Sequence, residues 1–168
     1  MKTVKILFVA LFMLGASSVF AQQKFAVVDA QQIMISMPEF DSVKVKMEKI
    51  QQDLMDEMQA NEKEYTNKIQ EYTKSKDNYS EAIRAQKEKE IQSLMTRIEE
   101  FQQVAQKEVQ DQNEKLMAPV REKLVNAIKS VGKANEFVFI FDKNSALYTS
   151  ETLVTDATTM VKTHLNLK

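Results

Sequence analysis

The chain has no cysteine and no tryptophan, and its 168 residues include one histidine, two glycines and two prolines. Without cysteine there are no disulfides and no thiolate metal ligands, and His164 alone cannot supply a zinc site. Cysteine nucleophiles are excluded, and a serine triad would have to use His164. Val161 and Leu165 flank this histidine at helical spacing, which indicates a surface position near a helix end. We therefore expect no metal, no cofactor and no enzymatic activity.

The scarcity of glycine and the nearly balanced charge exclude two further classes of protein, those that bind nucleotides and those that bind nucleic acids. Gly15 lies in an apolar N-terminal segment, which leaves Gly132 for the rest of the chain. Phosphate-binding loops and dinucleotide fingerprints need several glycines, so neither is present. Lys and Arg total 23 against 24 Asp and Glu, a formal net charge of −1. Nucleic-acid-binding domains are usually strongly basic, so we expect no nucleic-acid partner.

The N-terminus has the pattern of a secretory signal peptide over residues 1–21. Lys2 and Lys5 precede an apolar run at residues 6–14, and a Val-Phe-Ala cleavage site ends at Ala21. The run is shorter than the roughly 20 residues that cross a bilayer, so no stable membrane insertion is expected. A retained interfacial anchor is the alternative. Cleavage after Ala21 leaves a chain with a net charge of −3, because Lys2 and Lys5 are lost.

Two long apolar series predict two helices. In both series most steps are three or four residues, which is the spacing of a coiled-coil seam. The first helix begins at Pro38 and the second follows Ser80, an expected N-cap, and ends at Gly132. Residues 73–80 are polar and predict a tight tip. The helices should therefore form an antiparallel hairpin arm over residues 39–118, about 60 Å long at 1.5 Å per residue.

The two prolines are expected to mark the base of this arm. A turn centred between Asn78 and Tyr79 would place Pro38 opposite Pro119. Pro119 lies inside a helical pattern, where it removes a hydrogen bond and predicts a kink.

Residues 22–38, which lead into the arm, and residues 119–168 are predicted to form a small body. Residues 24–29 and the apolar run 137–141 read as strands, the second covered on both faces. Residues 146–148 are expected to return as the hairpin partner of that run, and Thr158 to cap a last helix. The fold class is α+β, with a long helical-hairpin arm projecting from a small β-containing body.

Self-association of this body is expected, because a sheet this small would leave much apolar surface exposed. The residues predicted at the subunit interface are Val27, Phe137, Phe139, Ile140 and Phe141.

The predicted elements follow one another in a distinctive order. A strand at residues 25–29 comes first, then a Met-Pro-Glu-Phe helix start at 37–40 and the long hairpin. An apolar strand and turn at 137–143, a return at 146–148 and a helix start at 156–161 complete the order. In this order of elements the chain resembles the Skp/OmpH-like periplasmic chaperone family. The resemblance covers essentially all residues after 21, and the order is more specific than any one motif. It implies a periplasmic homotrimer: a small intersubunit β-barrel body with three arms around a cavity that shelters unfolded outer-membrane proteins without ATP.

The chain departs from the family pattern in charge. Well-known members are strongly basic, whereas here the basic and acidic residues are segregated along the arm. The tip has a net charge of +2 over residues 68–89, and residues 39–64 have −4. The absence of a generally cationic cavity makes lipopolysaccharide binding doubtful.

Candidate client contacts are flexible or exposed side chains on the arm, since adaptable surfaces suit varied unfolded partners. They are Met55, Met95, Tyr72, Tyr79, Lys74, Lys76 and Arg84. Alternatively, the methionines fill the helix seam, a role favoured for Met47 and Met58, and the tyrosines pack there at heptad spacing. A different function also stays open: a trimeric coiled-coil spacer or scaffold of the cell envelope. An anion or nucleic-acid binder at the basic tip is a weaker third reading.

Overall fold

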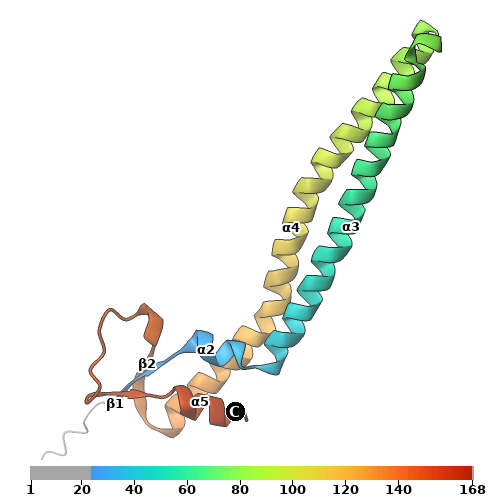
Figure 1. The fold of residues 1–168 in the computed structure, drawn as a ribbon. Coiled ribbons are helices and arrows are strands. Elements are labelled where there is room, and N and C mark those ends of the chain that lie inside the picture. The colour runs from blue at the N-terminus through green and yellow to red at the C-terminus, as the bar shows by residue number, and fades with distance from the viewer. Residues whose placement is uncertain (1–23, 168) are drawn as a thin grey trace, which may run out of the picture.

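The computed structural model describes residues 24–167, so the predicted signal peptide lies outside the described residues. Figure 1 shows a long helical hairpin projecting from a small body of short helices and strands. The elements in chain order are β1 (Lys24–Val28), α2 (Ala30–Ile35), α3 (Pro38–Ser75), η1 (Lys76–Asn78), α4 (Glu81–Ala134), β2 (Phe137–Asp142), η2 (Lys143–Ser145), β3 (Val154–Asp156) and α5 (Thr158–His164). The predicted α+β class, with an arm on a β-containing body, is confirmed.

The starts of the two arm helices follow local sequence signals. Pro38 occupies the first position of α3, where its missing N–H is not needed, and Glu39 and Asp41 lie in the positive first turn. The Ser80 side chain accepts a hydrogen bond from the Ile83 N–H at 3.4 Å, which confirms it as the N-cap of α4.

The pairing of the two arm helices differs from the sequence prediction. The Tyr65 hydroxyl lies 3.9 Å from the Met95 sulfur, and Glu39 at the base pairs with Lys123. The turn at residues 76–80 lies within the predicted tip. However, Tyr65 lies opposite Met95, three residues beyond the Gln92 that a turn centred between Asn78 and Tyr79 would place there. Pro38 is therefore near the level of Lys123, and the prediction that it faces Pro119 is wrong. α4 continues through Pro119 as a single helix of 54 residues.

The sheet is parallel throughout, with β1 in the centre and the order β2-β1-β3. The predicted hairpin between residues 137–141 and 146–148 is wrong, because residues 146–148 form no strand and the third strand is Val154–Asp156. β2 and β3 run parallel on opposite sides of β1, so no tight turn can join them. The chain therefore leaves β2 through η2 and a loop at residues 146–153 before it reaches the far side of β1.

The hydrophobic core of the body lies between the sheet and the base of the arm. The buried residues come from β1, α2, the lower part of α4 and α5, including Ala26, Val28, Ile33, Leu124 and Val161. Burial of such side chains contributes about 25 cal/mol per Å² of apolar surface and is the main stabilising term for this part of the chain.

Gly132 does not end α4, contrary to the sequence prediction. The helix continues to Ala134, and the chain turns only at Glu136, whose φ is +59°. Gly132 is buried, and a Cβ there would lie 3.2 Å from Cδ1 of Ile140. The glycine therefore allows β2 to approach α4 closely.

Thr158 is not an N-cap either, because it is the first residue of α5. Its hydroxyl accepts a hydrogen bond from the Asp29 N–H at 2.9 Å, and its own N–H donates to the Asp156 carboxylate at 3.0 Å. The residue thereby connects the end of β1 to the start of α5.

Candidate functional surfaces of the arm and the body

The arm presents exposed methionine beside a packed seam. Met47 is buried and Met58 is half-buried, as the seam reading favoured, whereas Met55 is 53 % exposed. Met95 lies at the edge of the seam, where its sulfur contacts Tyr65 and its side chain still reaches solvent. Met55 and Met95 are therefore both accessible from outside the hairpin.

The two tyrosines near the tip pack together instead of standing free. The rings of Tyr72 and Tyr79 have centroids 6.5 Å apart, and both side chains are half-buried. The Tyr72 hydroxyl donates to the Glu88 carboxylate across the hairpin, and this bond raises the pKa of Tyr72. These contacts fit the seam-packing alternative for the tyrosines.

The basic side chains at the tip are more open. Lys74, Lys76 and Arg84 are exposed, and the Arg84 guanidinium donates to the Tyr79 carbonyl at 3.3 Å. The tip therefore presents positive charge around a small aromatic contact.

An uncharged groove lies between α3 and α4 near the middle of the arm and has a volume of about 590 Å³. Its lining residues are Gln51, Leu54, Met55, Met58, Gln102, Ala105, Gln106, Val109 and Gln110. Sequence reasoning identified Met55 but missed the groove. The available signal was Ala105, a small residue at a seam position.

The exposed face of the sheet carries a line of aromatic rings. Phe25 stacks on Phe139 with centroids 6.2 Å apart, and Phe139 lies 5.8 Å from Phe141. Phe139 and Phe141 are each 56 % exposed, so the predicted covering of both faces of β2 is not met within one chain. Three apolar residues of the following loop, Leu147, Tyr148 and Leu153, are exposed as well. Of these, Tyr148 lines a pocket together with Phe25 and Phe141, a neighbour that sequence reasoning did not assign to this surface.

The other predicted interface residues take inner positions. Val27 is buried, and Phe137 and Ile140 are half-buried against the core. The structure therefore divides the predicted set: Phe139 and Phe141 are available to another molecule, and Val27, Phe137 and Ile140 already have partners within the chain.

A polar network closes the carboxyl ends of the strands. Lys143 pairs with Asp156 at 2.9 Å, and Asn144 donates to Asp29 at 3.2 Å. Hydrogen bonding from Thr158, followed by that from Lys143, lowers the pKa of Asp156 to about 2 against an opposing effect of burial. These groups hold the loop that leads from β2 to β3, and each polar partner already has a structural role.

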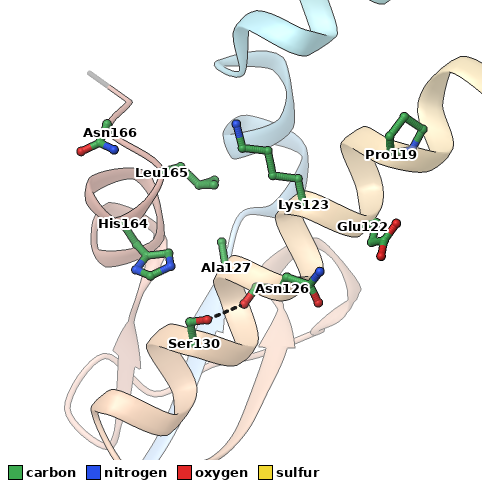
Figure 2. Close-up of a pocket in the computed structure, with 9 residues that line it drawn as sticks. All are labelled: Pro119, Glu122, Lys123, Asn126, Ala127, Ser130, His164, Leu165 and Asn166. Atoms are coloured by element: carbon green, nitrogen blue, oxygen red, sulfur yellow. Dashed lines mark hydrogen bonds between the residues drawn. The ribbon is translucent and has the colours of Figure 1, made fainter.

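At the base of the arm, Lys123 of α4 pairs with Glu39 of α3, and this bond lowers the pKa of Glu39. Beside it, Figure 2 shows a pocket between α4 and α5, with a volume of about 570 Å³ and His164, Leu165 and Asn166 on the α5 side. His164 is exposed in the last turn of α5, as predicted. The lining of this pocket mixes polar and apolar residues, and Lys123 within it is already paired with Glu39.

Within residues 24–167, no group of three or more His, Cys, Asp or Glu residues is arranged to hold a metal ion. Across the same described residues, no helix combines the length and the apolar character needed to span a membrane.

The protein is therefore a helical-hairpin protein, in which a long two-helix arm projects from a small parallel sheet with an exposed aromatic face. The model of the family described as "Outer membrane protein (OmpH-like)" matches residues 24–165. The chain belongs to this family.

Comparison with solved structures gives the same fold. A crystal structure of a candidate outer membrane chaperone (OmpH-like) from Caulobacter crescentus CB15 matches with a TM-score of 0.74. The sequences are 17 % identical, and the match covers 86 % of this chain and 84 % of the other. Among curated proteins, none matches.

Proposed function

We infer that the protein is an ATP-independent holdase chaperone of the periplasm, which binds unfolded outer-membrane proteins between its arms and prevents their aggregation. A chaperone role is supported by membership of the OmpH-like family and by the similar fold of the Caulobacter protein, which is described as a candidate outer membrane chaperone. The observation that carries the proposal is the projecting arm with accessible apolar side chains, such as Met55 and Met95. After residue 21 the sequence contains one glycine, Gly132, whereas the phosphate-binding loops of ATP-binding proteins need several.

The proposal divides the work between two parts of the chain. Residues 39–118 form the arm that contacts clients, and residues 22–38 and 119–168 form the body. Client contacts fall on Met55, Met95 and the exposed tip residues Lys74, Lys76 and Arg84, with Tyr72 and Tyr79 shaping the tip. Such weak contacts at many points suit an unfolded partner, because their combined avidity does not depend on one sequence.

We propose further that the body assembles into a homotrimer through the sheet. The exposed rings of Phe139 and Phe141 support this, since contiguous apolar patches on soluble proteins usually mark contact surfaces. Three arms on one body would then enclose a shared cavity. Export through the signal peptide over residues 1–21 would place this assembly in the periplasm.

Suppression of aggregation tests the function. A urea-denatured outer-membrane β-barrel protein is diluted into buffer with and without the purified protein, and light scattering is followed. Lower scattering, unchanged by added ATP, is the expected result. A spacer or scaffold would leave the scattering as it is in buffer alone, and that outcome would favour the alternative function.

Sedimentation of a double variant tests the trimer. Phe139→Asp with Phe141→Asp changes two side chains that are exposed in the single chain, so the body should still fold but not associate, because buried unpaired charge costs several kcal/mol. Val138→Asp, also on β2 and also exposed, is the matched control. A trimer of unchanged stability for the double variant would contradict this assembly.

A further inference from the structure

The groove in the middle of the arm exists because one seam position is too small. Leu54 and Met58 of α3 and Ala105 and Val109 of α4 are half-buried and form its floor. A coiled-coil seam is normally filled by residues the size of leucine, and the methyl group of Ala105 leaves that space open. Met55 forms one wall, and glutamines complete the lining, so the described lining carries no charged side chain.

The turns that carry the groove are acidic. Within residues 49–58 and 99–111 the charged side chains are Asp53, Asp56, Glu57, Glu99, Glu100, Glu108 and Asp111 against Lys49 and Lys107. Lys49 pairs with Asp53 at 3.1 Å and Lys107 pairs with Asp111, so both lysines are already engaged with acids of their own helices. The surroundings of the groove therefore favour a partner with positive charge beside its apolar part.

The groove nearer the tip differs in chemistry. Its lining includes Glu64, Lys68, Lys89, Glu90 and Arg97, and Arg97 pairs with Glu64 across the hairpin. Charged groups that pair with one another leave little apolar surface for a ligand. The uncharged lining is therefore a property of the middle of the arm and not of the whole hairpin.

The dimensions of the groove fit an extended polypeptide. Its lining extends from Gln51 to Met58 on α3 and from Gln102 to Gln110 on α4, a length of about 11 Å at 1.5 Å per residue. An extended chain rises about 3.3 Å per residue, so three or four residues span this length. Glutamine amides both donate and accept hydrogen bonds, which suits the unpaired main-chain groups of such a segment.

We propose that this groove binds short apolar segments of unfolded polypeptide that are flanked by lysine or arginine. The apolar residues occupy the floor above Ala105, and the basic residues lie over the acidic turns on either side. This inference rests on the proposed holdase function and assigns it a binding site. The site prefers positively charged segments, whereas the basic tip would prefer negatively charged ones.

Peptide binding to the full-length assembled protein tests the assignment. The probe is a fluorescein-labelled peptide with a central Val-Leu-Phe-Val stretch and two lysines on each side, and its companion carries glutamates in place of the lysines. Fluorescence anisotropy should show binding at least about tenfold tighter for the lysine-flanked peptide, with a preference that shrinks as salt screens the charges. Replacing Asp56 by Asn and Glu57 by Gln should reduce that preference.

Filling the groove provides the structural test. Ala105→Phe occupies the open seam position and should weaken the lysine-flanked peptide by about tenfold. Ala118→Phe, at an exposed alanine elsewhere on α4, should leave binding unchanged. Circular dichroism is used to check that both variants keep their helices. Equal binding of the two peptides, or full binding by Ala105→Phe with normal helix content, would overturn the assignment.

The remaining outcomes separate this site from its alternatives. If Ala105→Phe changes the sedimentation of the protein but not its peptide binding, the groove is occupied by a second copy and the assignment is wrong. The aggregation assay is read independently. Wild-type protein that binds the lysine-flanked peptide but does not suppress aggregation supports the groove and refutes the holdase function. Loss of peptide binding by Ala105→Phe, with aggregation still suppressed, supports both.

Discussion

Shortening the arm by one heptad on each helix tests whether clients are held between arms. The contacts across the hairpin give the facing segments: Tyr65 is next to Met95, and Tyr72 is next to Glu88. Deleting residues 65–71 together with 89–95 therefore removes matched levels. The Tyr72–Glu88 and Glu64–Arg97 contacts on either side of the deletion are retained, and the seam returns to the same face after seven residues.

The size of the expected effect follows from helix geometry. The 38 residues of α3 give an arm of about 57 Å, and seven residues account for about 10 Å of it. A cavity bounded by the arms would lose roughly a fifth of its depth. The body and the groove at residues 51–58 and 102–110 are untouched, so assembly and peptide binding should stay as they are.

The effect of shortening the arm is measured as protection from aggregation for two β-barrel proteins of different size. The shortened protein should still protect an eight-stranded outer-membrane protein but should protect a sixteen-stranded one less well, because less client surface can be enclosed. Many weak contacts predict a partial loss and not an abrupt one. A control deletion of residues 65–71 with 86–92 shortens the arm equally but removes Glu88, so a similar loss in both variants assigns the effect to length. Equal protection of both clients by the shortened and full-length proteins would refute a cavity.

Three further predictions concern the body and the tip. Because the pKa of Asp156 is lower in the folded state than the ordinary value of 3.8, its ionised carboxylate stabilises the folded state at every pH above about 3.8. This contribution is lost as the pH falls toward 2. The side chain is 46 % exposed, so solvent screening reduces the contribution to about 1 kcal/mol. Urea unfolding at a fixed protein concentration should therefore show Asp156→Asn less stable than wild type at pH 7 and nearly equal at pH 2, and a constant difference would contradict this. Gly132→Val should cost about 1–3 kcal/mol of unfolding free energy, because an added Cβ alone would lie 3.2 Å from Cδ1 of Ile140 and the two methyl groups of valine need further space. An unchanged denaturation midpoint would count against that contact. Amide hydrogen exchange should be fast at residues 76–80 and slow at Val27, which uniform protection from tip to body would disprove.

Most of the arm could be predicted from local sequence signals. Pro38 and Ser80 mark helix starts through their own backbone chemistry, and the apolar steps of three and four residues identify one face of each helix whatever lies elsewhere in the chain. The strands at residues 24–28 and 137–142 were also recognisable, because short apolar runs between polar turns have few other uses. The predicted client contacts share this local origin, and the exposed positions of Met55, Lys74 and Arg84 follow from the helix face on which each lies.

Only the tertiary structure decided how these elements meet. The turn lies within the segment that the sequence predicted, but the packing of α3 against α4 decides which residues face each other, so Pro38 lies near the level of Lys123 and not opposite Pro119. The parallel pairing of β1 with β3 joins residues far apart in the sequence, so the apolar residues 146–148 were mistaken for a hairpin strand. Gly132 has the sequence signal of a helix end, yet its role is to admit Ile140. The groove at Ala105 likewise requires two helices to be placed side by side, because an alanine is too small only in relation to the residues that face it.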